Sequence, residues 1–472
     1  MKERIKSCLL SLLIISSIVL SINMWFNEKL WSNDYNFFSN ITNIFKSENK
    51  GKSYYLSKEN ISYPEKIIIN NMEKRNRYTH TSKEYLQMIE PILSTIKKGF
   101  TECKFEETSK DDWNVILKSK SIYISYPIAY DTTLLSGILD VTASEVPAKL
   151  IKDIIICPTD PQSLTVNIFI KDDDNNKIYK STINHNYTFF SEIVEKYAID
   201  SINLIPYSFE LNFDKSSDVI EQKVVIEPTV TLKLEEQTLP NIKSQNCLTN
   251  IYEDVYTSSN ILRSFGYNTT NTKKYLDKNN TSVYVENFST LKIHNNGLLE
   301  YKSIDNTKGI SLTNKNSSTL YDNFIACIEF VNNLWDNAMP GKIFNVNLTS
   351  DILFDQKGQS FSITMDYYIN GHPVICKLDK TSSYDELLHG IEIKVSDGKI
   401  VEYRQLFNEY SLTSQIIKKG SAIDAIDAMF SNENLMSETI SALNIAYVNN
   451  NNIWNPVWTA TTTDNKLIII GR

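Results

Sequence analysis

The sequence predicts an α+β protein that is tethered to a membrane by one N-terminal helix. Residues 7–27 carry no charge, the rest of the chain alternates strand-like and helix-like patterns, and two segments of the later half resemble each other. A chain of 472 residues is too long for one ordinary core, so we expect several domains. The predicted parts are a cytoplasmic stub and anchor (1–32), a stalk (33–62), an N-terminal α+β domain (63–214), a middle α+β domain (215–380) and a C-terminal domain related to the middle one (381–472).

Composition excludes several classes of protein. The 48 basic residues are outnumbered by 56 acidic ones, which gives a formal net charge of −8, so nucleic acid is not an expected partner. The six cysteines show no C-x-x-C spacing, which argues against a disulfide framework and against a zinc cluster. We therefore expect no metal and no cofactor.

The uncharged segment 7–27 is long enough to cross a bilayer, which needs roughly 20 apolar residues. Three basic residues precede it, so the positive-inside rule places the N-terminus in the cytoplasm and the bulk of the chain outside the cell. A cleaved signal peptide is the alternative, but no A-x-A-like site follows the apolar run. Trp25 and Trp31 have the character of interfacial anchors, which favours an uncleaved, single-pass membrane protein.

One side of the predicted membrane helix carries small residues. At 100° per residue the side is formed by Ser7, Ser11, Ile14, Ser17, Ile18 and Ser21. In lipid, a small-residue face lets a second helix approach closely and share hydroxyl hydrogen bonds. The alternative is that serine is merely tolerated in a single-pass anchor, and the sequence leaves both interpretations open.

The N-terminal domain is predicted from periodicity. A capping-box pattern at 81–84 begins a helix whose apolar residues recur at helical spacing from Tyr85 to Ile96. Strands are expected at 66–70, 121–126, 153–157, 164–170 and 178–183, and a second helix at 188–198. The acidic run 172–176 is predicted to be a hairpin turn, because it lacks the glycine and downstream glutamate of a calcium loop. Three prolines are expected to interrupt regular structure between this domain and the next; they are Pro206, Pro228 and Pro240.

The later half contains an internal repeat. Residues 291–302 resemble residues 391–404, and both are predicted hairpins with glycine-containing turns. Helices at 320–335 and 421–430 and alternating strands at 361–369 and 443–447 follow the two hairpins. The pattern predicts two related modules, each an antiparallel sheet covered by a helix.

The chain lacks the short signatures of zinc peptidases, serine hydrolases and nucleotide-binding proteins. The five histidines, His80, His185, His294, His372 and His389, have no obvious partner in the sequence. His294 adjoins an Asn-Asn-Gly turn, His372 follows Asn370-Gly371 and His389 precedes a strand, so exposed turn positions explain them. His372 and Cys376 share strand parity and are the nearest approach to a nucleophile pair, although a buried strand cysteine is the commoner explanation. We therefore expect neither an enzyme nor a small-molecule substrate.

Several segments together resemble the YycH family. The N-terminus is short and charged, and the membrane segment runs into Met24-Trp25-Phe26. The terminal module contains Ala446-Tyr447-Val448 and Asn455-Pro456-Val457-Trp458, and supporting segments lie at 121–127, 368–374 and 398–403. The resemblance extends over nearly the whole chain and rests on the order of these segments.

This resemblance implies a membrane-anchored, extracytoplasmic accessory regulator of the WalK/WalR (YycG/YycF) two-component system of low-GC Gram-positive bacteria. Such proteins are not enzymes; they act with the related single-pass protein YycI and contact the sensor histidine kinase through transmembrane helices and outer domains, which affects cell-wall homeostasis. Asn-rich insertions at 268–280 and 306–318 depart from the family pattern. An extracytoplasmic ligand- or peptide-binding module is the alternative function, and an unrecognised wall-acting hydrolase is a further one.

Overall fold

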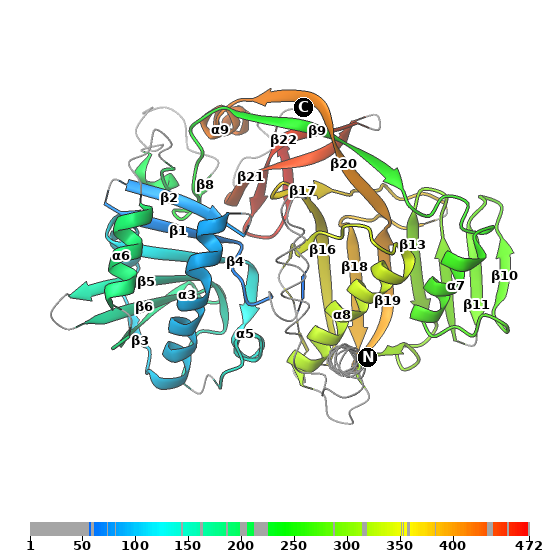
Figure 1. Cartoon of the computed structure of the whole chain (residues 1–472), viewed down its shortest axis with the longest axis horizontal. Helices are drawn as coiled ribbons and strands as arrows, with labels where there is room; N and C mark the ends of the chain where they lie inside the picture. The colour runs from blue at the N-terminus through cyan, green and yellow to red at the C-terminus, as the bar shows by residue number, and fades with distance from the viewer. Residues whose placement is uncertain are drawn as a thin grey trace, which may run out of the picture. The chain divides into compact units, whose positions relative to one another are not determined.

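A computed structural model gives the fold of most of the chain beyond residue 55 (Figure 1). It describes residues 56–57, 61–72, 74–80, 82–142, 145–160, 164–185, 187–198, 205–211, 225–286, 288–313, 319–350, 352, 354–355, 359–382, 384–431, 438–450 and 453–470. Within these ranges no helix has the length and apolar character that a membrane span needs. The predicted anchor and stalk lie outside the described residues, so the anchor stays a prediction.

The N-terminal part is a seven-stranded antiparallel sheet with the order β2-β1-β4-β5-β6-β7-β3. Its strands are β1 (Lys66–Asn71), β2 (Lys74–Thr79), β3 (Glu106–Thr108), β4 (Ser121–Asp131), β5 (Leu150–Asp160), β6 (Thr165–Asp172) and β7 (Lys177–Ile183). The predicted strands are confirmed. The acidic run after β6 forms the β6–β7 turn, as its polar composition indicates.

Helices cover both faces of this sheet. The amphipathic helices α3 (Lys83–Glu102) and α6 (Tyr187–Tyr197) bury their apolar stripes in a core on one face, together with α5 (Thr132–Leu139). Helix α4 (Lys110–Lys118) and the 3₁₀ turn η1 (Ser208–Glu210) belong to a smaller core on the other face. Ser82 caps α3 by accepting a hydrogen bond from the Tyr85 amide at 3.2 Å, so the cap is one residue later than the sequence pattern suggests.

The later half forms one sixteen-stranded sheet, whose main path is β10-β11-β12-β13-β19-β18-β16-β17-β21-β22-β9-β20. Its strands are β8 (Val225–Ile226), β9 (Gln237–Asn246), β10 (Lys273–Leu276), β11 (Ser282–Glu286), β12 (Ser289–Ile293), β13 (Leu298–Ser303), β14 (Ile310–Ser311), β15 (Val346–Leu348), β16 (Phe361–Ile369), β17 (His372–Ile375), β18 (Ile391–Ser396), β19 (Lys399–Leu406), β20 (Asn408–Lys419), β21 (Thr439–Asn450), β22 (Ile453–Thr462) and β23 (Leu467–Ile470). The neighbouring strands are antiparallel except for the parallel pairs β17–β21 and β8–β21.

The two hairpins of the internal repeat are neighbours in this sheet, because β13 of the first pairs with β19 of the second. Strand β16 also pairs with β18, so strand pairing crosses the predicted boundary at 380/381. The domain boundaries themselves stay a prediction. Pro240 does not end an element: it lies inside β9, opposite a shift in the register of β20, and such irregularities are where a strand tolerates proline.

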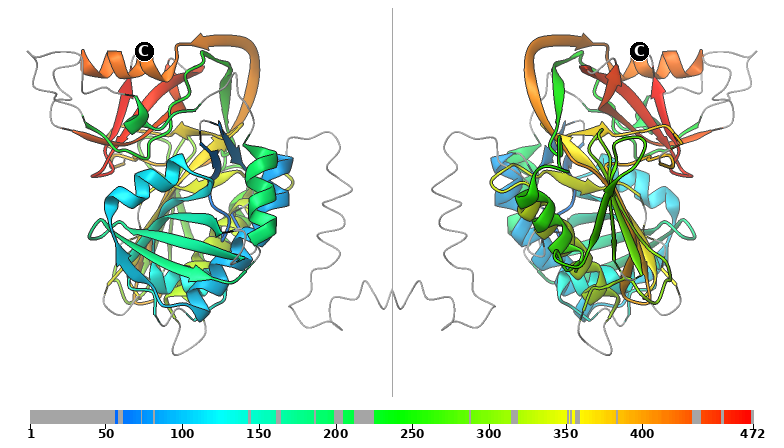
Figure 2. Two further views of the ribbon diagram at one scale, coloured as in Figure 1. Left: turned by 90° about the vertical axis from the view of Figure 1, so that its left-hand side faces the viewer. Right: turned by 90° about the vertical axis from the view of Figure 1, so that its right-hand side faces the viewer.

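Three helices cover parts of the large sheet. Helices α7 (Val255–Ser264) and α8 (Leu320–Ala338) lie over the strands from β10 to β16 (Figure 1). The periodicity of α8 predicts a stripe of six apolar residues, of which five are buried and Leu320 is partly exposed; the buried ones are Phe324, Cys327, Ile328, Val331 and Trp335. Helix α9 (Ala422–Phe430) lies on β21–β23, where it closes a separate small core (Figure 2). The chain is thus a mixture of large sheets and seven described α-helices.

Candidate functional site

A row of charged residues crosses the outer face of the large sheet, on the side away from α8. The covered face carries Leu291, Tyr301, Tyr403, Ile393 and Ile363 in register across five strands, and all five are buried. Successive residues of a strand point to opposite faces, so the next residue along each strand faces outward. This places Glu300, Arg404 and Glu392 side by side on β13, β19 and β18.

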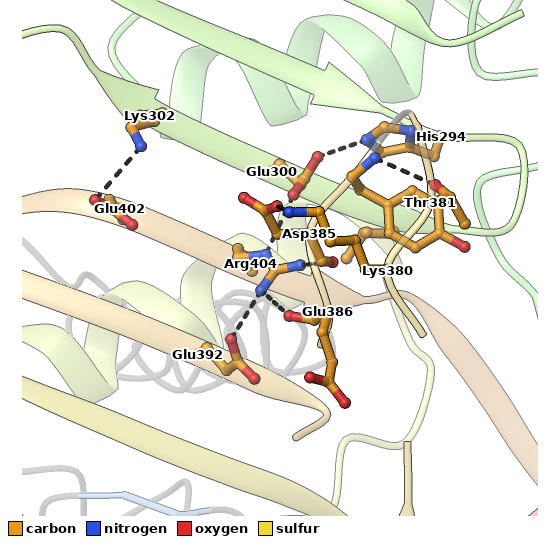
Figure 3. Close-up of polar contacts among 12 residues, drawn as sticks. His294, Glu300, Lys302, Lys380, Thr381, Asp385, Glu386, Glu392, Glu402 and Arg404 are labelled. Atoms are coloured by element: carbon orange, nitrogen blue, oxygen red, sulfur yellow. Dashed lines mark hydrogen bonds and ion pairs between the residues drawn. The ribbon is translucent and has the colours of Figure 1, made fainter. Parts of the chain in front are cut away.

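Arg404 is the centre of this row (Figure 3). Its Nε donates to Glu300 Oε1 at 3.2 Å, and its Nη1 donates to Glu392 Oε2 at 3.1 Å. Nη1 and Nη2 also donate to the main-chain carbonyls of Glu386 and Asp385, at 2.7 and 2.6 Å. The guanidinium therefore binds two strands and a loop at once, in the planar fork geometry that lysine cannot reproduce.

The loop that Arg404 holds connects β17 to β18 and spans residues 376–390. It closes on itself, since the amides of Leu378 and Leu387 each donate to the other's carbonyl, at 2.8 and 2.9 Å. Leu387 is fully buried, whereas the side chain of Leu388 is 52% exposed. The loop is thus a fixed surface feature that presents an apolar side chain among charged ones.

Two histidines, His294 and His389, lie at opposite ends of this row of charged residues. His294 Nε2 is 2.7 Å from Glu300 Oε2, its Nδ1 is 3.2 Å from Thr281 Oγ1, and its ring packs edge-on against Tyr384 of the loop. Only 4% of His294 is exposed. The prediction that it is an exposed turn residue without a partner is wrong, because the loop covers it.

His389, at the other end, is bound to Asp366. Its Nδ1 is 3.1 Å from Asp366 Oδ2, while Asp366 Oδ1 accepts the Gly390 amide at 2.8 Å. Burial alone lowers the pKa of His389, but the hydrogen bond and charge of Asp366, with a contribution from Glu392, outweigh it and raise this pKa above its usual value. This histidine also has a partner that the sequence did not indicate.

His372 and Cys376 have different partners. His372 Nδ1 is 3.1 Å from the Ile445 carbonyl, so Nδ1 carries the hydrogen, and burial followed by the charge of Lys233 lowers its pKa to about 4. The Cys376 thiol is 3.1 Å from the Tyr410 hydroxyl, and burial raises its pKa far above the usual range. A thiol held in its protonated form is a poor nucleophile.

Three further described cysteines, Cys157, Cys247 and Cys327, also lack the features of a reactive thiol. All five that the structure describes are free, and burial raises the pKa of Cys157, Cys247 and Cys327. Across the described ranges no group of three or more metal-binding side chains is found.

A hollow of about 620 Å³ lies beside α4 and bears on the ligand-binding alternative. Its walls include the exposed side chains of Met72 and Val115, and Lys118 and Lys120 lie at the same hollow. It opens widely to solvent, whereas ligand sites enclose most of their ligand. The hollow therefore does not favour a small-molecule site.

The predicted membrane-helix face and its interfacial anchors lie outside the described residues. This applies to Ser7, Ser11, Ile14, Ser17, Ile18, Ser21, Trp25 and Trp31. They stay predictions.

One family model and one solved structure of the YycH family are similar to this chain. The family model described as YycH protein, N-terminal domain, matches residues 3–198. The crystal structure of YycH from Bacillus subtilis superposes with a TM-score of 0.57 at 9% sequence identity, covering 90% of this chain and 100% of that one. An uncharacterized protein from Eubacterium rectale gives a TM-score of 0.29 at 11% identity, covering 52% of this chain and 83% of that one. No curated protein matches the chain.

Proposed function

Because this chain belongs to the YycH family, we propose that it is a membrane-anchored, non-enzymatic accessory regulator of a WalK-type sensor histidine kinase. The match of the family's N-terminal domain to residues 3–198 is the observation that carries the proposal, since it includes the predicted anchor as well as the first sheet. A YycI-like single-pass protein is the proposed second partner, and cell-wall homeostasis is the proposed process.

The proposed mechanism is a shift in a two-state equilibrium of the kinase. A helix packed beside a kinase helix changes the kinase's activity only if it binds one signalling state more tightly than the other. A coupling of about 1–3 kcal/mol changes the ratio of the states by roughly 5- to 150-fold. The face formed by Ser7, Ser11, Ser17 and Ser21 is the proposed contact in the membrane.

The outer domains supply a second proposed contact, which is the surface of loop 376–390. The Arg404 bonds fix this loop, so binding a partner there costs little ordering entropy. Leu388 is exposed at its end and provides an apolar group for the contact. The donors of Arg404 are bound to Glu300, Glu392 and the loop carbonyls. This arrangement suits a role in fixing the loop surface better than a role in catalysis.

Co-purification from native membranes tests the proposal. We expect the full-length chain to capture the kinase and a form lacking residues 1–32 to lose it. Replacing Ser11 and Ser21 by leucine should weaken capture, whereas replacing Leu12 and Val19, which lie on the opposite side of the helix, by isoleucine should not. Equal capture by all forms would refute the membrane contact.

A separate pair of variants tests the outer contact. Leu388→Arg should reduce capture, while Leu86→Arg, at an exposed leucine of α3, should leave it unchanged. Undiminished capture with Leu388→Arg would exclude loop 376–390 from the interface without affecting the membrane contact.

A further inference from the structure

Two cationic side chains, those of Lys66 and Arg77, are neighbours on strands β1 and β2, and the charge of Arg77 also acts on a third, Lys233. In the antiparallel register Lys66 lies opposite Thr79, so Arg77 is its diagonal neighbour on the same face of the sheet. Such neighbours lie about 7–8 Å apart, within reach of long side chains. Lys233 completes the group: the charge of Arg77 acts on it as well as on Lys66.

None of these three charged groups has a hydrogen bond or ion pair with another described residue, and Arg77 Nε is buried without a partner. Arg75, two residues earlier on the same strand, is the contrast. Its Nη1 and Nη2 bind Glu210 at 2.6 and 3.0 Å, and its Nε binds Asn70 at 2.7 Å. Strand β2 thus carries one guanidinium whose donors have hydrogen-bond partners, that of Arg75, and one whose Nε has none, that of Arg77.

The cluster is electrostatically unfavourable as it stands. Burial, followed by the charge of Arg77, lowers the pKa of Lys66 to about 8 and also lowers the pKa of Lys233. Lys152 adds a fourth positive charge near Lys66, and the nearby carboxylates are those of Glu65 and Asp153. Asp153 is already engaged, since its Oδ1 accepts the Tyr123 hydroxyl at 2.8 Å. The two carboxylates therefore offset the repulsion among the cations only in part.

Two neutral polar groups complete the surroundings. Tyr368 lies close enough to Arg77 for that charge to affect it, and burial keeps its phenol protonated by raising its pKa. Burial, followed by the charges of Lys233 and Arg77, lowers the pKa of His372, so its imidazole is neutral. A protonated phenol donates a hydrogen bond to an anion without adding charge.

We propose that Lys66, Arg77 and Lys233 form a binding site for a phosphate group, carried either by inorganic phosphate or by a lipid headgroup. Partly buried positive charges are stabilised by an accompanying anion, and the carboxylates that act on Lys66, those of Glu65 and Asp153, form no ion pair with any of the three cations. A guanidinium with free donors binds phosphate oxygens in a planar, bidentate manner, and ammonium groups supplement it as point charges.

Thermal unfolding of the full chain in a neutral detergent tests the site. Inorganic phosphate is titrated against chloride at constant ionic strength, near pH 7.5. We expect the unfolding temperature to rise and saturate, and we expect Arg77→Met and Lys66→Met to weaken the phosphate affinity by about tenfold or more. Lys273→Met, which removes an exposed lysine of β10, is the matched control and should behave as the unmodified chain does.

A second readout separates a binding role from a structural one. Without phosphate, Arg77→Met should be at least as stable as the unmodified chain, because it removes repulsion among unpaired charges. An equal phosphate effect in the unmodified chain and in Arg77→Met, or no effect in either, would overturn the proposal. If Arg77→Met does not fold, Lys233→Met provides the same comparison.

The source of the phosphate group is distinguished by a second titration with glycerophosphoglycerol, a soluble diester headgroup. Stronger stabilisation by inorganic phosphate assigns the site to the free ion, and stronger stabilisation by the diester assigns it to a lipid. Stabilisation by poly-aspartate alone would refute the phosphate site and indicate an acidic protein segment instead.

Discussion

Replacing Arg404 by lysine tests whether a single guanidinium holds loop 376–390 on the sheet. Lysine keeps the positive charge beside Glu300 and Glu392 but lacks the planar fork that reaches the carbonyls of Asp385 and Glu386. Arg404 is only 17% exposed at its side chain, so solvent compensates these lost bonds poorly.

The expected magnitude follows from the bonds that are lost. Two charge-assisted hydrogen bonds to the loop disappear, and water can reach the freed carbonyls once the loop moves. We therefore expect the free energy of opening the loop to fall by about 1–2 kcal/mol. Each 1.4 kcal/mol changes an equilibrium tenfold, so loop amides should exchange with solvent roughly 5- to 30-fold faster.

Hydrogen exchange measured by mass spectrometry on the full chain gives the required local readout. The amides of Leu378 and Leu387 report on the loop because each donates to the other's carbonyl. Lys302→Met is the control, since Lys302 lies on the same face but makes only an exposed ion pair with Glu402 at 3.8 Å. Exchange of both amides within twofold of the unmodified rate would show that Arg404 does not hold the loop.

Three further predictions concern other parts of the fold. His389→Gln should lower the unfolding temperature more at pH 6 than at pH 9: the raised pKa of His389 means that its stabilising contribution is present below the unfolded value near 6.5 and is lost as the pH rises through the folded value. Trp335→Ala should destabilise the large sheet by about 3–5 kcal/mol in chemical denaturation, because the indole stacks on Phe344 at 4.6 Å inside the core. Ser421→Ala should cost about 1 kcal/mol through loss of the α9 cap, whereas Ser414→Ala, at an exposed strand position, should cost almost nothing in the same measurement.

Local patterns in the sequence were sufficient for most of the helices and hairpins. The apolar stripe of α8 and the helical pattern of α9 each lie within one helix, so neighbouring residues specify them. The β6–β7 turn was predictable for the same reason, since its polar residues tolerate turn geometry.

Long-range pairing was not predictable in this way. The paired strands β9 and β20 are separated by about 160 residues of sequence, and neither alternates strictly between apolar and polar residues. Loop 376–390 and Arg404, which binds it, both lie more than 80 residues after His294 in the sequence. A histidine beside an Asn-Asn-Gly turn therefore looked exposed, because the loop that buries it was not recognisable.

The two arginines of β2 show why a candidate site could not be read from residue type. The sequence Lys-Arg-Asn-Arg-Tyr-Thr places both on one face of the strand, yet Arg75 finds Glu210 from a distant segment and Arg77 finds no acid. Two arginines in equivalent positions of a strand can therefore differ, because the tertiary structure gives only one of them an acidic partner.

That difference also separates the two polar clusters in their expected roles. The Arg404 guanidinium donates to carboxylates and carbonyls of the same chain, so it fixes the position of the loop. Few of its donors remain free to bind a ligand. At Arg77 the charge meets Lys66 and Lys233, so folding alone leaves the cluster unfavourable and an added anion lowers its energy. Stabilisation by phosphate should therefore disappear with Arg77→Met and persist with Arg404→Lys, and a loss in both variants would mean that the two clusters are not independent.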